Sequence, residues 1–337
     1  MTGLSQLSQI LIVTSLAIWI LTLLCGKLGL PYIRGLNIGQ SVRSDGPKTH
    51  FKKSGTPTFG GLFFLLPMAV SALVLPLVDK SFLTYSILIG LSLAFGLVGF
   101  IDDYIKVRVD KEGLSVLHKT IFLGLVCLVF SVWFLWFSGF QPFLYLPFVK
   151  QAVLISGNWK YLYLIFIVLY LFFMANAVNI TDGIDGLVSS LMPVTALFLA
   201  VVIYLLYPAK EEAGSLIQAC LALLAGCLGF LHFNKQPAQI FMGDTGSQAL
   251  GAAFGAIALL AGIPWIMAVI GLIYVVEALS TLIQVFYYKL TGGKRLFRMA
   301  PLHHHFELGG WTEGKIVKNY VIFAICCGLL AVGMVLF

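Results

Sequence analysis

The feature that most constrains this chain is a series of ten apolar runs, each about as long as a helix that crosses a bilayer. Of the 337 residues, 60% are apolar and only 10% are charged, which excludes an ordinary soluble globular protein. No alternation of polar and apolar residues typical of an outer-membrane barrel is evident. We therefore expect an all-α polytopic membrane protein that forms a single domain over residues 1–337. The ten runs lie near residues 7–28, 58–78, 82–101, 116–138, 161–180, 186–206, 214–232, 245–262, 264–289 and 316–337.

The basic residues of the connecting segments predict which way the helices face. If the N-terminus lies outside the cell, the inside segments are 29–57, 102–115, 181–185, 233–244 and 290–315. Seventeen of the 21 Lys and Arg residues lie in or beside these segments. The positive-inside rule therefore places both termini outside and the net charge of +7 on the cytoplasmic face, next to anionic membrane lipid. Nucleic acid is not an expected partner, because no arginine-rich module or basic aromatic sheet pattern is evident.

The run at 264–289 is longer than a bilayer requires. As a straight helix, its 26 residues would measure about 39 Å against about 30 Å of hydrocarbon. We therefore expect this helix to tilt, bend or protrude. It also contains Glu277 and Gln284, polar groups that either bond a neighbouring helix or take part in substrate binding.

Five of the fourteen acidic residues lie at ends of the expected helices: Asp102, Asp103, Asp182, Asp185 and Asp244. The order of the helices brings all five to the same membrane face. Helix capping is a common role for Asp, but the adjacent Asp102 and Asp103 would repel each other beside hydrocarbon unless a cation or basic group compensates. Carboxylates without thiolates favour a hard cation, so we expect Mg²⁺ together with phosphate groups.

Basic and hydrogen-bonding residues on the same face suit a phosphorylated substrate. Lys53 and Lys119 lie there, although loop lysines are common on any inside face. The three consecutive histidines at 303–305 favour phosphate contact by one or two imidazoles over zinc, whose ligands are usually spaced. The run GDTGS at 243–247 offers backbone N–H groups as an anion cradle. These residues predict an enzyme, and a secondary transporter is the competing class.

Six motifs, taken in order along the chain, resemble those of the phospho-N-acetylmuramoyl-pentapeptide transferases of bacterial peptidoglycan synthesis. The resemblance covers essentially the whole chain and includes the number of expected helices. Phe59 stands where that family usually has Met, a change between two large apolar residues. The motifs are DGPKTH at 45–50 with Lys53, GTPTFGG at 55–61, FIDDY at 100–104, NAVNITDGIDGL at 176–187, FMGDTGS at 241–247 and PLHHHFE at 301–307.

This resemblance implies transfer of phospho-N-acetylmuramoyl-pentapeptide from UDP-N-acetylmuramoyl-pentapeptide to undecaprenyl phosphate, which gives lipid I and UMP. It implies Mg²⁺ as cofactor and a bacterial plasma membrane protein whose active site faces the cytoplasm. By the same resemblance, the catalytic residues are Asp102, Asp103, Asp244 and His303, with Asp244 as the magnesium ligand. The substrate-binding residues that it implies are Lys53, Lys119, Asn179, Asp182, Asp185, Asn234, Phe241, His304 and His305.

The residues leave three questions open. Enzymes that transfer N-acetylglucosamine-1-phosphate to polyprenyl phosphate share the aspartate motifs, although the HHHFE loop followed by GWTE at 310–313 resembles the muramoyl branch. The transfer is either one direct displacement or proceeds through a covalent intermediate on Asp102 or Asp103. Gly96 and Gly99 are compatible with a homodimer or with close helix packing inside one chain.

Overall fold

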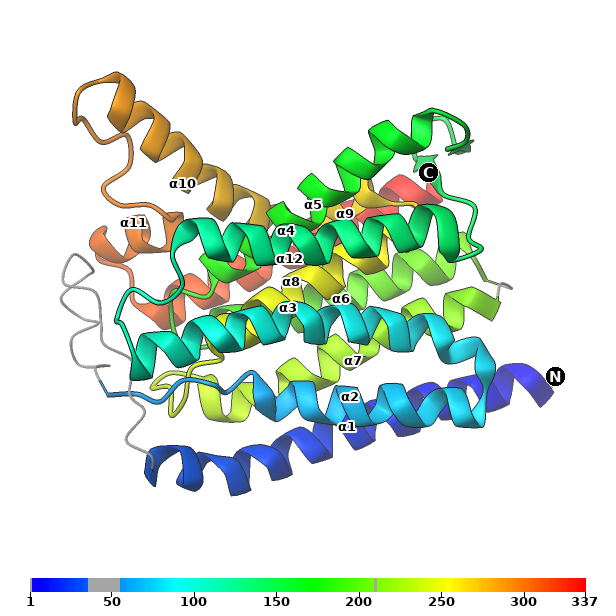
Figure 1. The fold of residues 1–337 in the computed structure, drawn as a ribbon, viewed down its shortest axis with the longest axis horizontal. Coiled ribbons are helices and arrows are strands. Elements are labelled where there is room, and N and C mark those ends of the chain that lie inside the picture. The colour runs from blue at the N-terminus through cyan, green and yellow to red at the C-terminus, as the bar shows by residue number, and fades with distance from the viewer. Residues whose placement is uncertain (1, 36–54, 209–210) are drawn as a thin grey trace.

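The computed structural model describes residues 2–35, 55–208 and 211–337, most of which are helical. Long helices lie side by side in one bundle, from which α10 projects (Figure 1). The α-helices are α1 (Thr2–Gly35), α2 (Leu62–Val78), α3 (Leu83–Arg108), α4 (Val116–Val132), α5 (Trp159–Thr181), α6 (Leu187–Leu206), α7 (Glu211–Asn234), α8 (Gly243–Leu260), α9 (Pro264–Ile270), α10 (Leu272–Leu290), α11 (Leu302–Leu308) and α12 (Glu313–Leu336). Shorter elements are the 3₁₀ turn η2 (Lys80–Phe82), the π-turn η3 (Trp133–Phe137) and the strands β1 (Phe143–Leu146) and β2 (Gln151–Leu154).

A helix occupies each of the ten apolar runs, with α9 and α10 sharing the ninth. Within the described ranges, seven helices are long and apolar enough to cross a membrane, and the bent pair α9–α10 makes an eighth. The apolar helix α2 has only 17 residues. The expected helical membrane protein is therefore confirmed, whereas the number of ten crossings stays a prediction.

The run at 264–289 contains a sharp break. Between α9 and α10 the chain bends by 84° at Gly271. Past the bend, α10 leaves the bundle (Figure 1) and exposes the apolar side chains of Leu282, Phe286 and Leu290. The excess length of this run is thus accommodated by bending and protrusion, as expected.

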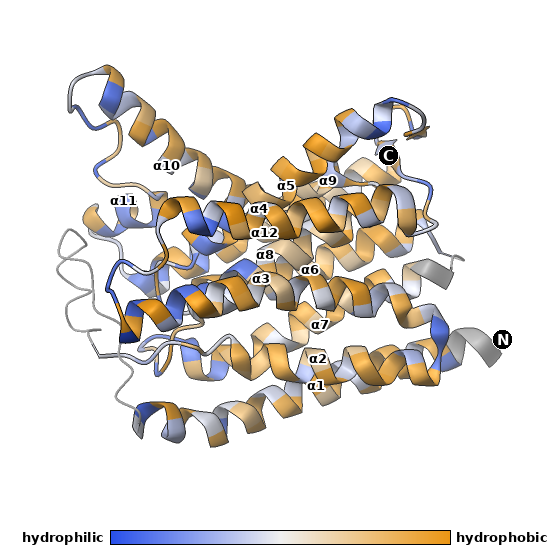
Figure 2. Cartoon of the chain, in the orientation of Figure 1, coloured by the Kyte–Doolittle hydropathy of each residue, from blue (hydrophilic) through white to orange (hydrophobic). Residues whose placement is uncertain are grey.

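The two ends of the bundle differ in character. The first helix begins and the last helix ends at the same end of the bundle, where the β1–β2 hairpin also lies (Figure 1). This antiparallel hairpin pairs Phe143 with Leu154 and Leu146 with Gln151, and it is an addition to the expected all-α fold. Figure 2 shows apolar residues along the middle of the helices and hydrophilic residues gathered toward the end where α11 lies.

Helix α8 is the buried centre of the bundle. Every residue from Thr245 to Leu259 is buried, and more than half of them are Gly or Ala, so neighbouring helices approach closely. On α3, a Cβ atom added at Gly96 would lie 3.4 Å from the Cβ of Ala249. One added at Gly99 would overlap the backbone of Asp244. These two glycines therefore serve helix packing inside the chain.

We expect Gly99→Ala to destabilise the fold, because the new methyl group would push α3 away from the start of α8. Overpacking of this kind costs about 1–3 kcal/mol. The matched control is Gly90→Ala on the same helix, where no atom lies within 4 Å of the added Cβ and where Ala favours the helix. Thermal unfolding of both variants in detergent is the measurement, and equal midpoints would contradict the packing role of Gly99.

Candidate active site

Two aspartates and two lysines meet at the end of the bundle that carries α11. The Nζ atom of Lys106 lies 2.8 Å from Oδ2 of Asp102 and 2.9 Å from Oδ2 of Asp244. The Nζ atom of Lys119 lies 2.9 Å from Oδ2 of Asp102 and also contacts Oδ2 of Asp244. The other oxygen of Asp102 accepts a hydrogen bond from the Leu114 N–H at 2.7 Å. The helices α3, α4 and α8 thus build a cluster of two negative and two positive groups.

Asp103 has a different role from its neighbour. Its carboxylate accepts the backbone N–H groups of Asp244 at 3.1 Å and Thr245 at 2.9 Å, and the Thr245 hydroxyl at 2.7 Å. The N-cap residue of α8 is Met242, whose side chain makes no capping hydrogen bond. Asp103 therefore caps α8 from another helix, where the helix dipole favours a negative charge. These N–H groups bind Asp103, so they do not form the open anion cradle expected from the GDTGS run.

Helix α5 supplies another contact to the cluster. The Asn179 amide donates hydrogen bonds to Oδ1 of Asp244 and to the Ser247 hydroxyl, each at 2.8 Å. Lys106 was not singled out from the sequence, where it counted only as an inside charge. Its spacing of four residues from Asp102 on a helix was the available signal, since such residues share one face.

Asp182 follows α5 and lies half-buried beside the cluster. Burial raises the pKa of its carboxyl well above the ordinary range, and the negative charges of Asp244, Asp103 and Asp185 raise it further. This electrostatic coupling agrees with the expected convergence of the five acids. Because the charged form is disfavoured, a cation or a hydrogen-bond donor on a ligand would stabilise it.

Two of the expected substrate-binding residues are bonded within the protein. Asp185 accepts the Ala238 N–H at 2.9 Å. Asn234 accepts the Ser189 hydroxyl and donates to the Ile240 carbonyl at 3.1 Å. Both side chains are buried and connect the segment after α7 to the start of α6. Their direct contact with a nucleotide stays a prediction.

Phe241 joins two segments of the site through its backbone. Its N–H donates to the Pro57 carbonyl at 2.9 Å, and its carbonyl accepts the Gly60 N–H at 2.8 Å. The half-buried ring lies in the segment that leads to α8, and stacking on uracil stays a prediction. Lys53 lies outside the described residues.

The three consecutive histidines have separate partners. His303 is fully buried, whereas His304 and His305 are half-buried. The side-chain nitrogens lie close to Glu277 for His303, to Glu307 for His304 and to the Arg298 backbone N–H for His305. This divergence is consistent with the expectation that the three do not bind one ion.

Two carboxylates of the cluster are hard oxygen donors of the kind that Mg²⁺ prefers. In residues 2–35, 55–208 and 211–337, no group of three or more His, Cys, Asp or Glu side chains is arranged to hold a metal by itself. Asp244 and Asp102, however, present carboxylate oxygens to the same two ammonium groups. Proteins often bind Mg²⁺ through one or two carboxylates and complete its coordination with phosphates and water.

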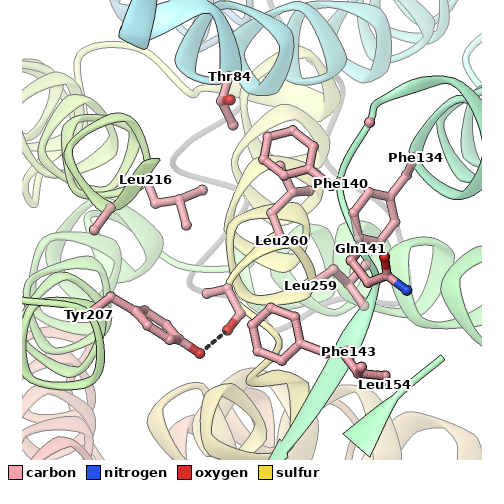
Figure 3. A pocket seen from close by; sticks show the side chains of 13 residues that line it. Thr84, Phe134, Phe140, Gln141, Phe143, Leu154, Tyr207, Leu216, Leu259 and Leu260 are labelled. Carbon is pink, nitrogen blue, oxygen red and sulfur yellow. Dashed lines mark hydrogen bonds between the residues drawn. The ribbon is translucent and has the colours of Figure 1, made fainter. Parts of the chain in front are cut away.

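A separate cavity of about 360 Å³ lies near the start of α3 and the end of α8. Figure 3 shows Phe140 and Phe143 beside it, and Tyr207 donating a hydrogen bond to the Ala261 carbonyl. Its lining includes Thr84, which precedes Asp102 by about 27 Å along α3. Since the lining residues carry no charge, this cavity is distinct from the aspartate–lysine cluster.

Comparison with known proteins adds a family to this geometry. Residues 85–262 match the model described as Glycosyl transferase family 4. The chain is also similar to proteins named phospho-N-acetylmuramoyl-pentapeptide-transferase. The one from Listeria innocua is 41% identical over 335 residues, 98% of this chain and 100% of the relative. Those from Acetivibrio thermocellus and Carboxydothermus hydrogenoformans are 47% and 44% identical, covering 88% and 91% of this chain and 86% and 93% of their own lengths.

We expect Asp103→Asn to lower the stability of the protein by about 2–3 kcal/mol, because hydrogen bonds from the buried start of α8 are lost. Asp182→Asn should leave stability unchanged or raise it at neutral pH. The substitution removes a carboxyl group whose charged form is disfavoured by burial. Because the folded-state pKa is raised, the unfolded chain loses this proton first as pH rises, so the stability advantage of Asp182→Asn over the unmodified protein should grow as pH rises above about 4 and shrink as pH falls back toward it. Thermal unfolding in detergent measures both, and a stable Asp103→Asn would refute the capping role.

Proposed function

The chain belongs to the family of phospho-N-acetylmuramoyl-pentapeptide transferases, and we propose that it transfers phospho-N-acetylmuramoyl-pentapeptide from UDP-N-acetylmuramoyl-pentapeptide to undecaprenyl phosphate. The products are lipid I and UMP. The observation that carries the proposal is the cluster of Asp102, Lys106, Lys119 and Asp244 at one end of an apolar helical bundle. The names of the relatives favour this donor over UDP-N-acetylglucosamine.

The protein acts in the bacterial plasma membrane, with ten crossings and the cluster on the cytoplasmic side. Most of the Lys and Arg residues lie in or beside the connections at that side, which the positive-inside rule assigns to the cytoplasm. A soluble nucleotide donor reaches the cluster from the cytoplasm, whereas the lipid acceptor reaches it from the bilayer. This placement explains why a charged site lies at the end of membrane helices.

The two lysines compensate the negative charge of the phosphate groups during the transfer. A lipid phosphate must approach a diphosphate, so two anions have to be brought together and held in line. Lys106 and Lys119 are held in place by Asp102 and Asp244, with their ammonium groups between the carboxylates. Phosphate oxygens can take up the remaining N–H donors of these groups, which stabilises the charge that develops during transfer.

Asp244 would hold Mg²⁺ in this proposal, and Asn179 orients its carboxylate. The ion, when bound, neutralises charge on the diphosphate and polarises the bond to phosphorus. Asp102 is the carboxylate placed to orient the acceptor phosphate or to accept its proton. We favour a direct displacement, because three donors engage each alternative nucleophile. Asp103 is bonded by donors of α8, and Asp102 is bonded by the Leu114 N–H and the two lysines.

The function is tested by UMP release from purified protein given UDP-N-acetylmuramoyl-pentapeptide and undecaprenyl phosphate. We expect release that requires both the lipid and Mg²⁺ and that falls at least about 100-fold in Asp244→Ala. Gly90→Ala serves as the matched control, because its added Cβ contacts nothing. Release from UDP-N-acetylglucosamine alone would assign the sister reaction, and silence with both donors would overturn the proposal.

We further propose that the polyprenyl chain lies along α10. This helix leaves the bundle after the 84° bend and exposes Leu282, Phe286 and Leu290 to the bilayer. A photoreactive polyprenyl phosphate should therefore label α10, and unlabelled undecaprenyl phosphate should compete. Labelling confined to other helices would contradict this placement.

A further inference from the structure

Glu277 lies fully buried on α10, six residues after the bend at Gly271. Its Oε1 atom accepts the backbone N–H of His303 at 3.1 Å and the hydroxyl of Tyr320. Its Oε2 atom lies 3.2 Å from Nδ1 of His303. One carboxylate thus connects α10, α11 and α12, and both of its oxygens are engaged.

The other ring nitrogen of His303 faces the loop after α5. In the described part of the chain, Nε2 is buried and has no hydrogen-bond partner. A Cβ atom added at Gly183 would overlap this nitrogen, so the absence of a side chain there lets the imidazole reach the loop. Gly183 follows Asp182, whose pKa responds to Asp244 and Asp103. The nitrogen without a partner therefore faces the loop that carries Asp182.

We propose that Glu277 is a positioning residue that fixes the orientation of the His303 ring, so that the protonated imidazole donates a hydrogen bond from Nε2–H to a phosphate oxygen of the substrate. The inference rests on the proposed function and adds to it a role for Glu277. A carboxylate only accepts hydrogen bonds, so it places a proton on Nδ1. A neutral imidazole would then present a lone pair at Nε2, which cannot bond an unprotonated phosphate oxygen. Only the imidazolium donates at both nitrogens.

The surroundings explain why this carboxylate is required. Both side chains are fully buried, and a buried charge is costly unless a partner of opposite charge and hydrogen bonds compensate. Tyr320 contributes a further donor to Oε1 and thereby orients the carboxylate. In the same way, a carboxylate in other enzymes fixes the tautomer and the orientation of a catalytic histidine.

The test compares kcat and KM for UMP release in Glu277→Gln and Glu277→Asp. Glu277→Gln keeps the size of the side chain but removes its charge, so we expect kcat to fall about 30- to 100-fold with KM for the nucleotide donor changed less than about threefold. Glu277→Asp keeps the charge and should retain more activity. The matched control is Ser280→Ala, because the Ser280 hydroxyl donates to the Glu277 backbone carbonyl and to no other group in the described part of the chain. We expect its kcat to stay within about twofold of the unmodified enzyme.

A double variant separates positioning from a purely structural role. In a His303→Gln background, Glu277→Gln should lower kcat no further, because Glu277 acts through His303. Effects that multiply, or equal activities of the Asp and Gln variants, would overturn the proposal. If Glu277→Gln does not fold, the same comparison is made with Glu277→Asp in the His303→Gln background, and the same two outcomes support or overturn the proposal.

The two proposals fail in distinguishable ways. If the unmodified protein releases no UMP from the proposed donor, the proposed function is wrong and this inference falls with it. If the unmodified protein is active and Glu277→Gln matches it in kcat, only the role of Glu277 is wrong.

Discussion

The hydrogen bonds between Asp103 and the first turn of α8 are the interaction on which the rest of the site depends. They satisfy backbone N–H groups in the first turn of α8, which its N-cap residue leaves uncapped. They also hold α3 against α8 where Gly99 allows close contact. This contact determines where Asp244 stands. With Asp103 committed to α8, Asp102 is left to face the two lysines. The two adjacent acids therefore have different roles: Asp103 holds two helices together, and Asp102 pairs with the lysines.

Charge balance is the second constraint, because the cluster lies at the end of apolar helices. Two carboxylates beside hydrocarbon would repel each other without compensation, and Lys106 and Lys119 supply two positive charges. The same lysines are the groups that anionic phosphates require. In our proposal the resting protein thus keeps its cationic groups in place by pairing them with acids, and a substrate exchanges some of these contacts for its own phosphate oxygens.

The helix positions were predictable, because hydropathy is a local property and each apolar run became a helix. The bend near Gly271 was partly predictable from the excess length of its run. The division of labour between Asp102 and Asp103 was not, since it depends on which face of α3 meets α8. Lys106 was missed because it was counted only as one of many charges of an inside loop. Its spacing of four residues from Asp102, which places both on one helix face, was not considered. The hairpin was missed because strands of four residues are too short to show a period.

The bend between α9 and α10 gives one helix two chemical tasks. Near the bend, Glu277 is buried against α11 and α12 and bonds His303. Farther along, Leu282 and Phe286 face outward, where the bilayer would lie. A straight helix inside the bundle would bury both groups, and a helix outside it would leave the carboxylate in hydrocarbon without its partners. In our proposal, successive turns of this one helix therefore orient His303 toward a substrate phosphate and contact the polyprenyl tail, the two tasks that transfer to a lipid phosphate requires.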